Sequence, residues 1–166
     1  MAAILAVVGK SGAGKTTLIE KLIPEIQSHG YRVAVVKHHA HPTPIDTPGK
    51  DSWRFAQAGA GVVVVASPAE MARYERLERE LTLAEIAARL PEVDLILAEG
   101  YKRENVARIE VSRAAQAMEL LSRADEVLAV VSDHATGLQV PHFGLDDAPG
   151  LAAFIIARLL PAREKS

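Results

Sequence analysis

The chain has 166 residues, no cysteine, and 19 basic against 21 acidic side chains, which leaves a formal net charge of −2 at pH 7. The nearly balanced charge gives no general argument for nucleic acid or an anionic membrane as a partner, and the missing cysteines exclude disulfides, zinc–cysteine sites and thiol catalysis by this chain. No apolar run reaches the roughly 20 residues of a membrane span, and a strand follows Met1 at once, so we expect no signal peptide and a cytoplasmic protein.

Apolar runs of strand type alternate with segments of helical spacing. Strands are predicted at residues 3–8, 31–36, 62–65, 93–99, 107–111, 126–131 and 140–143. Helices are predicted at 15–28, with a kink or break near Leu22–Ile23 because Pro24 lies inside it, and at 51–58, 82–90 and 151–160. Short helical pieces are predicted within 67–79 and 118–121. The run Val62–Val65 is apolar on both faces, which is typical of a buried parallel strand. The alternation predicts one α/β domain over residues 1–166, a doubly wound, mostly parallel sheet with helices on both faces.

The first strand and helix are joined by Gly9-Lys10-Ser11-Gly12-Ala13-Gly14-Lys15-Thr16, which fits G-x-x-x-x-G-K-[ST] in the strand–loop–helix context of a P-loop NTPase. Glycines let the backbone approach phosphate closely, and the helix N-terminus adds positive potential. Lys15 is predicted to reach the β- and γ-phosphates, and Thr16 to offer its hydroxyl to Mg²⁺.

A P-loop needs a second acidic group for Mg²⁺, and the strand at 93–99 contains Asp94 and Glu99. Five strand residues separate the two by roughly 16 Å. Parallel strands share their carboxyl edge with the P-loop, and Glu99 is at that end. We therefore predict that Glu99 serves Mg²⁺, directly or through water, and that Asp94 caps or solvates the other end.

The longest loop follows the second strand and carries Asp46-Thr47-Pro48-Gly49, with the D-x-x-G spacing of a GTPase switch. Asp46 would contact Mg²⁺ or its waters, and the Gly49 N–H would face the γ-phosphate. The same four residues also describe an ordinary turn. The candidate catalytic residues are thus Lys15, Asp46 and Glu99, and the candidate metal ligands are Thr16, Glu99 and Asp46.

Three further groups leave alternatives open. Lys37 with His38, His39 and His41 either lines an anionic pocket, holds the loop by hydrogen bonds, or forms a metal site, which adjacent residues pointing to opposite faces disfavour. Lys102 and Arg103 are either anion-binding or ordinary surface cations. Trp53 and Phe55 are predicted to pack in a core or interface rather than to stack on a base.

Asp133 ends the strand at 126–131 and places a carboxylate at the ligand edge. A carboxylate can accept from the N1–H and N2–H₂ groups of guanine. Although the N-K-x-D signature is absent, Asp133 is the candidate guanine reader, with a turn aspartate as the alternative.

In chain order, several blocks coincide: the loop Gly9–Thr17, Lys37-His38-His39, the stretch from Asp46 to Arg54, Ala58-Gly59-Ala60, the stretch from Asp94 to Lys102, and Val131-Ser132-Asp133 with Val140-Pro141. Together they resemble MobB, the molybdopterin-guanine dinucleotide biosynthesis protein B family. The P-loop alone is generic, but the K-H-H, D-T-x-G-K-D-S and E-G-[FY]-K blocks make the resemblance specific over nearly the whole chain.

The resemblance implies a GTP-binding accessory protein with Mg²⁺, a slow GTPase at most. It would act with the nucleotidyltransferase MobA, which joins GMP to molybdopterin, and it would be a homodimer of the SIMIBI branch. Gly9 to Thr17 would then hold the phosphates. Lys10 falls where that branch has a signature lysine reaching its partner subunit, although Ser11 stands where the pattern has glycine.

Two other functions compete with this one. A P-loop small-molecule kinase would use an arginine-bearing lid, for which Arg73–Arg79 is the candidate segment. A molybdopterin carrier or chaperone would use nucleotide only as a switch.

Overall fold

We analysed a computed structural model of the chain, which describes residues 2–39, 41, 43–116 and 118–163. The chain divides into two compact units. The first comprises residues 1–38 and 83–166, and the second is His39–Thr82. One domain over residues 1–166 stays a prediction.

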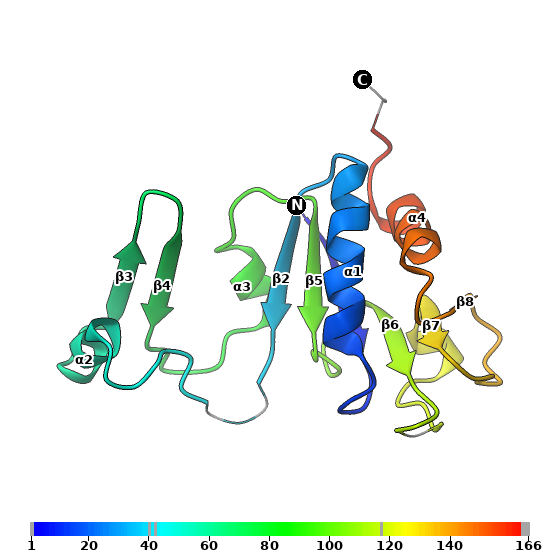
Figure 1. Ribbon diagram of the computed structural model, residues 1–166, viewed down its shortest axis with the longest axis horizontal. Coiled ribbons are helices and arrows are strands. Elements are labelled where there is room, and N and C mark those ends of the chain that lie inside the picture. The colour runs from blue at the N-terminus through cyan, green and yellow to red at the C-terminus, as the bar shows by residue number, and fades with distance from the viewer. Residues whose placement is uncertain (1, 40, 42, 117, 164–166) are drawn as a thin grey trace. The chain divides into compact units, whose positions relative to one another are not determined.

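The first unit is built on a six-stranded sheet in which every strand pair is parallel, with the order β2-β5-β1-β6-β7-β8 (Figure 1). The strands are β1 (Ala3–Val8), β2 (Val33–Lys37), β5 (Leu95–Glu99), β6 (Ala107–Ser112), β7 (Ala129–Ser132) and β8 (His142–Phe143). The central strand β1 lies between β5 and β6. The α/β fold with a parallel sheet is therefore as the sequence predicts.

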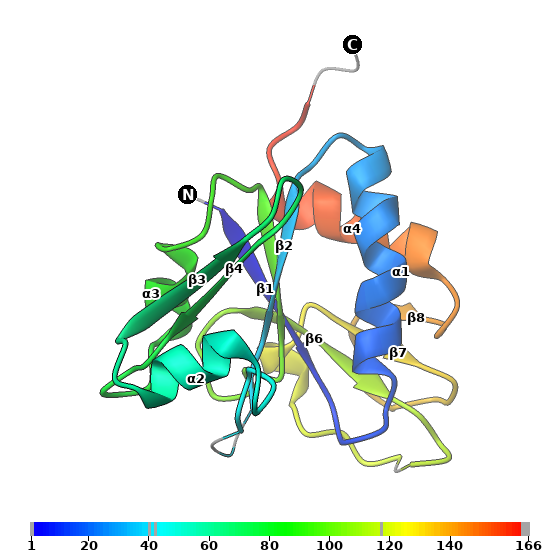
Figure 2. The same ribbon diagram turned by 60° about the vertical axis from the view of Figure 1, so that its left-hand side comes forward.

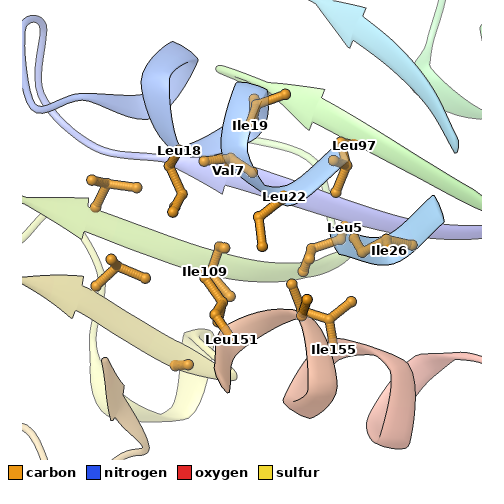
Figure 3. Close-up of a cluster of buried hydrophobic side chains, with 14 of the residues drawn as sticks. Leu5, Val7, Leu18, Ile19, Leu22, Ile26, Leu97, Ile109, Leu151 and Ile155 are labelled. Atoms are coloured by element: carbon orange, nitrogen blue, oxygen red, sulfur yellow. The ribbon is translucent and has the colours of Figure 1, made fainter. Parts of the chain in front are cut away.

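Alternate residues of the sheet face two apolar layers. On one face, helices α1 (Lys15–Ser28) and α4 (Ala148–Leu159) pack over the strands. Figure 3 shows Leu22 of α1 and Leu151 of α4 pointing into one layer with Leu5 of β1. On the other face, the short helix α3 (Leu83–Ala87) places Leu83 in a second cluster with Ala98. Helices thus cover both faces, as predicted.

Helix α1 runs unbroken through Pro24, so a break near Leu22–Ile23 is wrong, and the alternative of a kink stays a prediction. Proline removes the N–H that would bond the carbonyl of Glu20, four residues earlier. Both Glu20 and Pro24 are exposed, so water can satisfy that carbonyl. The helix therefore needs no break.

The second unit holds α2 (Asp51–Gln57) and a hairpin of β3 (Val62–Ala66) and β4 (Met71–Glu75), which Figure 2 also shows. Two predictions fail here: Val62–Val65 belongs to an antiparallel, mostly exposed strand, and the 67–79 segment forms β4 in place of a helix. Ser67 explains both. Its Oγ accepts from the Glu70 N–H at 3.0 Å and its own N–H donates to the Glu70 carbonyl at 2.8 Å, which closes a tight turn.

The predicted helical piece at 118–121 is also wrong, and a 3₁₀ turn at Ala124–Glu126 (η1) follows it. The N–H groups of Leu121 and Ser122 donate to the two carboxylate oxygens of Glu110, at 2.6 and 2.9 Å. A side chain thus takes the amides that a helix would use. Among the described helices, none is both long and apolar enough to cross a bilayer.

Candidate functional site

The predicted ligand-binding residues of the first unit gather where the parallel strands end. The P-loop leaves β1 at this edge and enters α1 (Figure 2). In the sheet register, Glu99 pairs with Val7 of β1 on one side and with Lys37 of β2 on the other. Open parallel sheets bind ligands at this edge.

Glycines fix the path of the P-loop backbone. A Cβ added to Gly9, whose φ is +143°, would lie 2.2 Å from the Val111 carbonyl oxygen on β6. Gly14 has φ +97° and is the N-cap of α1. A side chain would therefore collide at Gly9 and be strained at Gly14, so the loop needs glycine there.

Lys15 closes the loop from inside. Its Nζ donates to the carbonyls of Gly9 at 3.0 Å and Lys10 at 2.9 Å. Burial lowers the pKa of Lys15, the Glu99 carboxylate opposes that shift, and the nearby Lys37 adds to it. The structure thus holds a partly desolvated ammonium against the P-loop backbone, which suits an anionic ligand.

Thr16 and Glu99 meet across the sheet edge. The Thr16 hydroxyl lies 3.2 and 3.1 Å from the two Glu99 carboxylate oxygens, and the Lys37 ammonium lies 3.5 Å from one of them. The Glu99 residue is only 9% exposed. Hydroxyl and carboxylate oxygens are the hard ligands that Mg²⁺ prefers, so these residues fit that ion. The predicted position of Glu99 beside the P-loop is confirmed, and its role toward Mg²⁺ stays a prediction.

Asp94 lies at the opposite end of β5, as predicted. It accepts from the backbone N–H of Arg32 at 2.6 Å and from the Arg163 guanidinium at 2.7 Å. The Arg32 N–H lowers the pKa of Asp94 most, and Arg163 lowers it further against the opposing effect of burial. This carboxylate is held by structural donors.

The switch-like residues belong to the second unit, whereas Lys15 and Glu99 belong to the first. The Asp46 carboxylate accepts from the Thr47 N–H at 2.7 Å, the Lys50 N–H donates to the Thr47 carbonyl, and Gly49 has φ +88°. This is turn geometry. Contacts of Asp46 with Mg²⁺ and of Gly49 with the γ-phosphate stay predictions.

The histidines after β2 do not share an environment. The His38 ring packs on the Tyr101 ring with centroids 5.0 Å apart, while His39 and His41 are exposed. Within the part of the chain that the structure describes, no three histidine or carboxylate side chains gather as metal ligands. His38 thus packs against Tyr101, and the alternatives of an anionic pocket and of hydrogen bonds that hold the loop stay predictions. Lys102 and Arg103 are exposed.

The kinase-lid candidate is part of the hairpin. Arg73 lies in β4 and pairs with Glu75 at 2.9 Å. Only the first three residues of the candidate segment Arg73–Arg79 are paired with β3. This paired part differs from a mobile arginine-bearing lid and gives the kinase reading no support.

Asp133 follows directly on β7, at the predicted edge. Its Oδ1 accepts from the Ala114 N–H at 2.8 Å, and Ser132 beside it donates to the His134 carbonyl at 2.6 Å. One carboxylate oxygen therefore orders the loop after β6. Guanine recognition by Asp133 stays a prediction.

Two side chains from the loop after β6 lie against the P-loop, and no motif in the sequence indicates them. The Arg113 guanidinium lies 3.5 Å from the position of a Cβ on Gly14, and the Gln116 amide lies 3.1 Å from that of a Cβ on Gly12. Lys10 also bonds Glu119 of this loop, at 3.1 Å. The only signal available was positional, because residues after any parallel strand lie at the ligand edge.

Comparisons with known proteins identify the family of this chain. A family model described as "Molybdopterin guanine dinucleotide synthesis protein B" matches residues 4–133. The chain is 40% identical to the "Molybdopterin-guanine dinucleotide biosynthesis adapter protein" of Escherichia coli strain K12, over 94% of this chain and 93% of that protein. It is 34% identical to the protein of the same name from Haemophilus influenzae, over 92% and 86%.

Solved structures give the same result. The crystal structure of "molybdopterin-guanine biosynthesis protein B (mobB)" has a TM-score of 0.70 and 31% identity, covering 93% of this chain and 98% of that chain. Bacillus subtilis MobB has a TM-score of 0.76 and 26% identity, over 96% and 99%. With the P-loop and its distal acid in place on this fold, the chain belongs to the MobB family of molybdopterin guanine dinucleotide synthesis proteins.

Proposed function

We propose that this protein is a GTP-binding adapter that uses Mg²⁺ and assists a MobA-type guanylyltransferase in making molybdopterin guanine dinucleotide. The adapter role is supported by the names of its relatives in E. coli and H. influenzae. GTP, Mg²⁺, the transferase, the cytoplasmic location and contact with molybdopterin are parts of the proposal.

The observation that carries the proposal is the contact of Thr16 with Glu99 beside the P-loop. The glycine backbone and Lys15 would hold the polyphosphate, with Lys10, Ser11, Ala13 and Thr17 contributing to the same loop. Thr16 and Glu99 would hold Mg²⁺, which supplies charge neutralisation on the phosphate oxygens.

We propose that hydrolysis is slow at most, as the resemblance to the MobB family implies. Asp46, which the sequence suggests for contact with Mg²⁺ or its waters, belongs to the second unit. Such a protein suits a conformational or delivery step better than rapid turnover.

A homodimer is supported by the hairpin of the second unit. Its strands form a sheet of only two described strands, so each has an open edge. Val64 and Val65, on opposite faces, are both about half exposed, at 53% and 48%, and Met71 is 73% exposed. Apolar side chains on open strands are typical of interfaces. Sedimentation of the wild type and of Val64→Lys tests this, with Ile45→Lys, exposed elsewhere in the same unit, as the control.

The central experiment measures binding of GTP, GDP and ATP by calorimetry with and without Mg²⁺, and phosphate release with and without the transferase. We expect GTP preference, Mg²⁺ dependence and little release. A strong ATP preference would contradict GTP binding, and rapid turnover without a partner would contradict the adapter role. Lys15→Met should abolish binding under every alternative, so it serves only as the loss-of-binding control.

Asp133 needs a measurement that separates base from phosphate recognition, because its carboxylate also orders the loop after β6. The ratio of GTP to ATP affinity does this. We expect Asp133→Ala to reduce the ratio, with Asp125→Ala, an exposed acid on η1, as the control. An unchanged ratio would reject Asp133 as the guanine reader.

A further inference from the structure

Arg113 follows β6 directly and extends over the start of α1. One terminal guanidinium nitrogen lies 3.5 Å, and the central carbon 4.0 Å, from the position that a Cβ on Gly14 would occupy. Gly14 has φ +97° and immediately precedes Lys15. A second cation thus lies against the P-loop, on the side of β6, whereas Lys15 bonds carbonyls of the loop itself.

The charge of Arg113 is poorly compensated. Its Nε is buried and has no hydrogen-bond partner among the described residues. Asp146 is an acid that interacts with it electrostatically, but the carboxylate of Asp146 pairs with Lys21 at 2.7 Å. A half-buried cation without a close partner is unfavourable, and an anion at the same place would offset that penalty.

The loop that carries Arg113 is anchored on both sides. The N–H of the next residue, Ala114, donates to Asp133, which directly follows β7. Further along, Leu121 and Ser122 donate to Glu110, which is only 1% exposed. These anchors limit the conformational entropy that the arginine loses when it binds a ligand.

We propose that Arg113 is a phosphate-binding residue, whose guanidinium contacts the polyphosphate of the nucleotide held by the P-loop. The planar fork of arginine can donate two parallel hydrogen bonds to phosphate oxygens, which a lysine ammonium cannot. The inference rests on the proposed nucleotide binding and adds a residue that none of the motifs includes.

The test compares Arg113→Met, Arg113→Lys and the control Arg123→Met. Arg123 also follows β6 in the sequence, and its side chain is 77% exposed. Among the described contacts, it pairs only with its sequence neighbours Asp125 and Glu126. Affinities for GTP, GDP and inorganic tripolyphosphate are measured by calorimetry, and thermal unfolding is measured without ligand. We expect at least tenfold weaker GTP binding in Arg113→Met, an intermediate loss in Arg113→Lys, and less than a twofold change in Arg123→Met.

Unfolding separates a ligand-binding role from a structural one. Because Arg113 is poorly paired, Arg113→Met should keep or raise the unliganded melting temperature while it weakens binding. GTP affinity within twofold of wild type, or a loss that matches a fall in melting temperature, would overturn the inference, as would failure of both Arg113 variants to fold. If the wild type binds tripolyphosphate but not GTP, the proposed function fails while the tripolyphosphate affinities still test Arg113.

Discussion

Strand β5 ends in the acid Glu99 and is directly preceded by the acid Asp94, and the two carboxylates have different partners. Asp94 accepts from a backbone N–H at 2.6 Å and from an arginine at 2.7 Å. Glu99 has the Lys37 ammonium 3.5 Å away and accepts a hydrogen bond from the hydroxyl of Thr16 in the P-loop. Both carboxylates are largely shielded from water, at 17% and 11% side-chain exposure. Burial alone therefore does not identify the functional acid; the nature of its partners does.

The hydrogen-bond partners explain why we assign a structural role to Asp94 and a ligand-binding role to Glu99. A carboxylate that accepts from backbone and a close arginine is fixed in place and strengthens the fold. A carboxylate whose neighbours are a hydroxyl and a more distant ammonium can exchange them for a metal ion or its waters. Four predictions test this contrast, beginning with the largest effect.

Glu99→Gln should weaken Mg²⁺-dependent GTP binding by about 10- to 100-fold, as loss of a carboxylate near a metal typically does. Its melting temperature should change little. Calorimetry with and without Mg²⁺ measures the effect, and Asp94→Asn is the matched control on the same strand. Equal GTP affinity in the two variants would remove the contrast between the two ends of β5.

Asp94→Asn should lower the free energy of unfolding by about 1–2 kcal/mol near neutral pH, because it removes charge-assisted hydrogen bonds. The folded-state pKa of Asp94 lies below its unfolded value. The stabilisation is therefore complete above the unfolded pKa and disappears as pH falls through the folded pKa, so the two proteins should converge in acid.

Urea titrations over pH 2–7 measure that difference, where about pH 4 is the ordinary range of the group. Glu92→Gln is the control, since Glu92 is at the same end, is 89% exposed and pairs with Arg32 at 3.5 Å. It should change stability by less than about 0.5 kcal/mol. A difference for Asp94→Asn that persists at pH 2 would show that the charge is not its source.

Nucleotide affinity should fall on the alkaline side because of Lys15. Burial lowers the pKa of Lys15 in the free protein, and bound phosphate would raise it again. Binding is therefore fully favourable below the free-protein pKa and weakens up to about tenfold per pH unit until the bound-state pKa is passed. GTP titrations from pH 7 to 11 extend past the ordinary lysine pKa of 10.5 and therefore past the lowered one, and a flat profile over that range would contradict an ammonium–phosphate contact.

Arg163→Met should have the smallest effect, a loss of about 1 kcal/mol in unfolding free energy. Arg163 bonds Asp94 and the Gly30 carbonyl, and its guanidinium lies 4.7 Å from the centre of the Tyr31 ring. An exposed cation–π contact contributes about 0.5–1 kcal/mol. Arg158→Met, which removes a looser contact with Phe154 at 5.8 Å, is the control and should cost less. A larger loss of unfolding free energy in the control would show that the contacts of Arg163 with Asp94, Gly30 and Tyr31 do not stabilise the fold.

The sequence correctly predicted those elements whose local residue pattern matches their position in the folded sheet. Strand β1 has the predicted bounds, Ala3–Val8, because an apolar run rich in β-branched residues directly before a glycine-rich loop is compatible with few structures other than a buried strand. The opposite positions of Asp94 and Glu99 followed from strand length and parallel direction alone.

The hairpin was missed because four consecutive valines are compatible with two arrangements. Val62–Val65 would suit a buried parallel strand, but a turn at Ser67 pairs them with β4, and periodicity cannot report a partner. Arg113 was missed for a related reason. Its importance depends on the adjacency of β6 to β1, which is a property of topology and has no local motif.

The close approach of Gly9 to Val111 has a consequence for mutational tolerance. Any side chain at Gly9 would push on the backbone of β6, and so would disturb the sheet and the P-loop together. In a saturation scan, selection for abundance and selection for GTP binding should therefore reject the same substitutions at Gly9. At Gly49 an added Cβ would meet nothing within 4 Å, so the strain of its φ of +88° is the only backbone penalty on a side chain there, and the two selections can diverge.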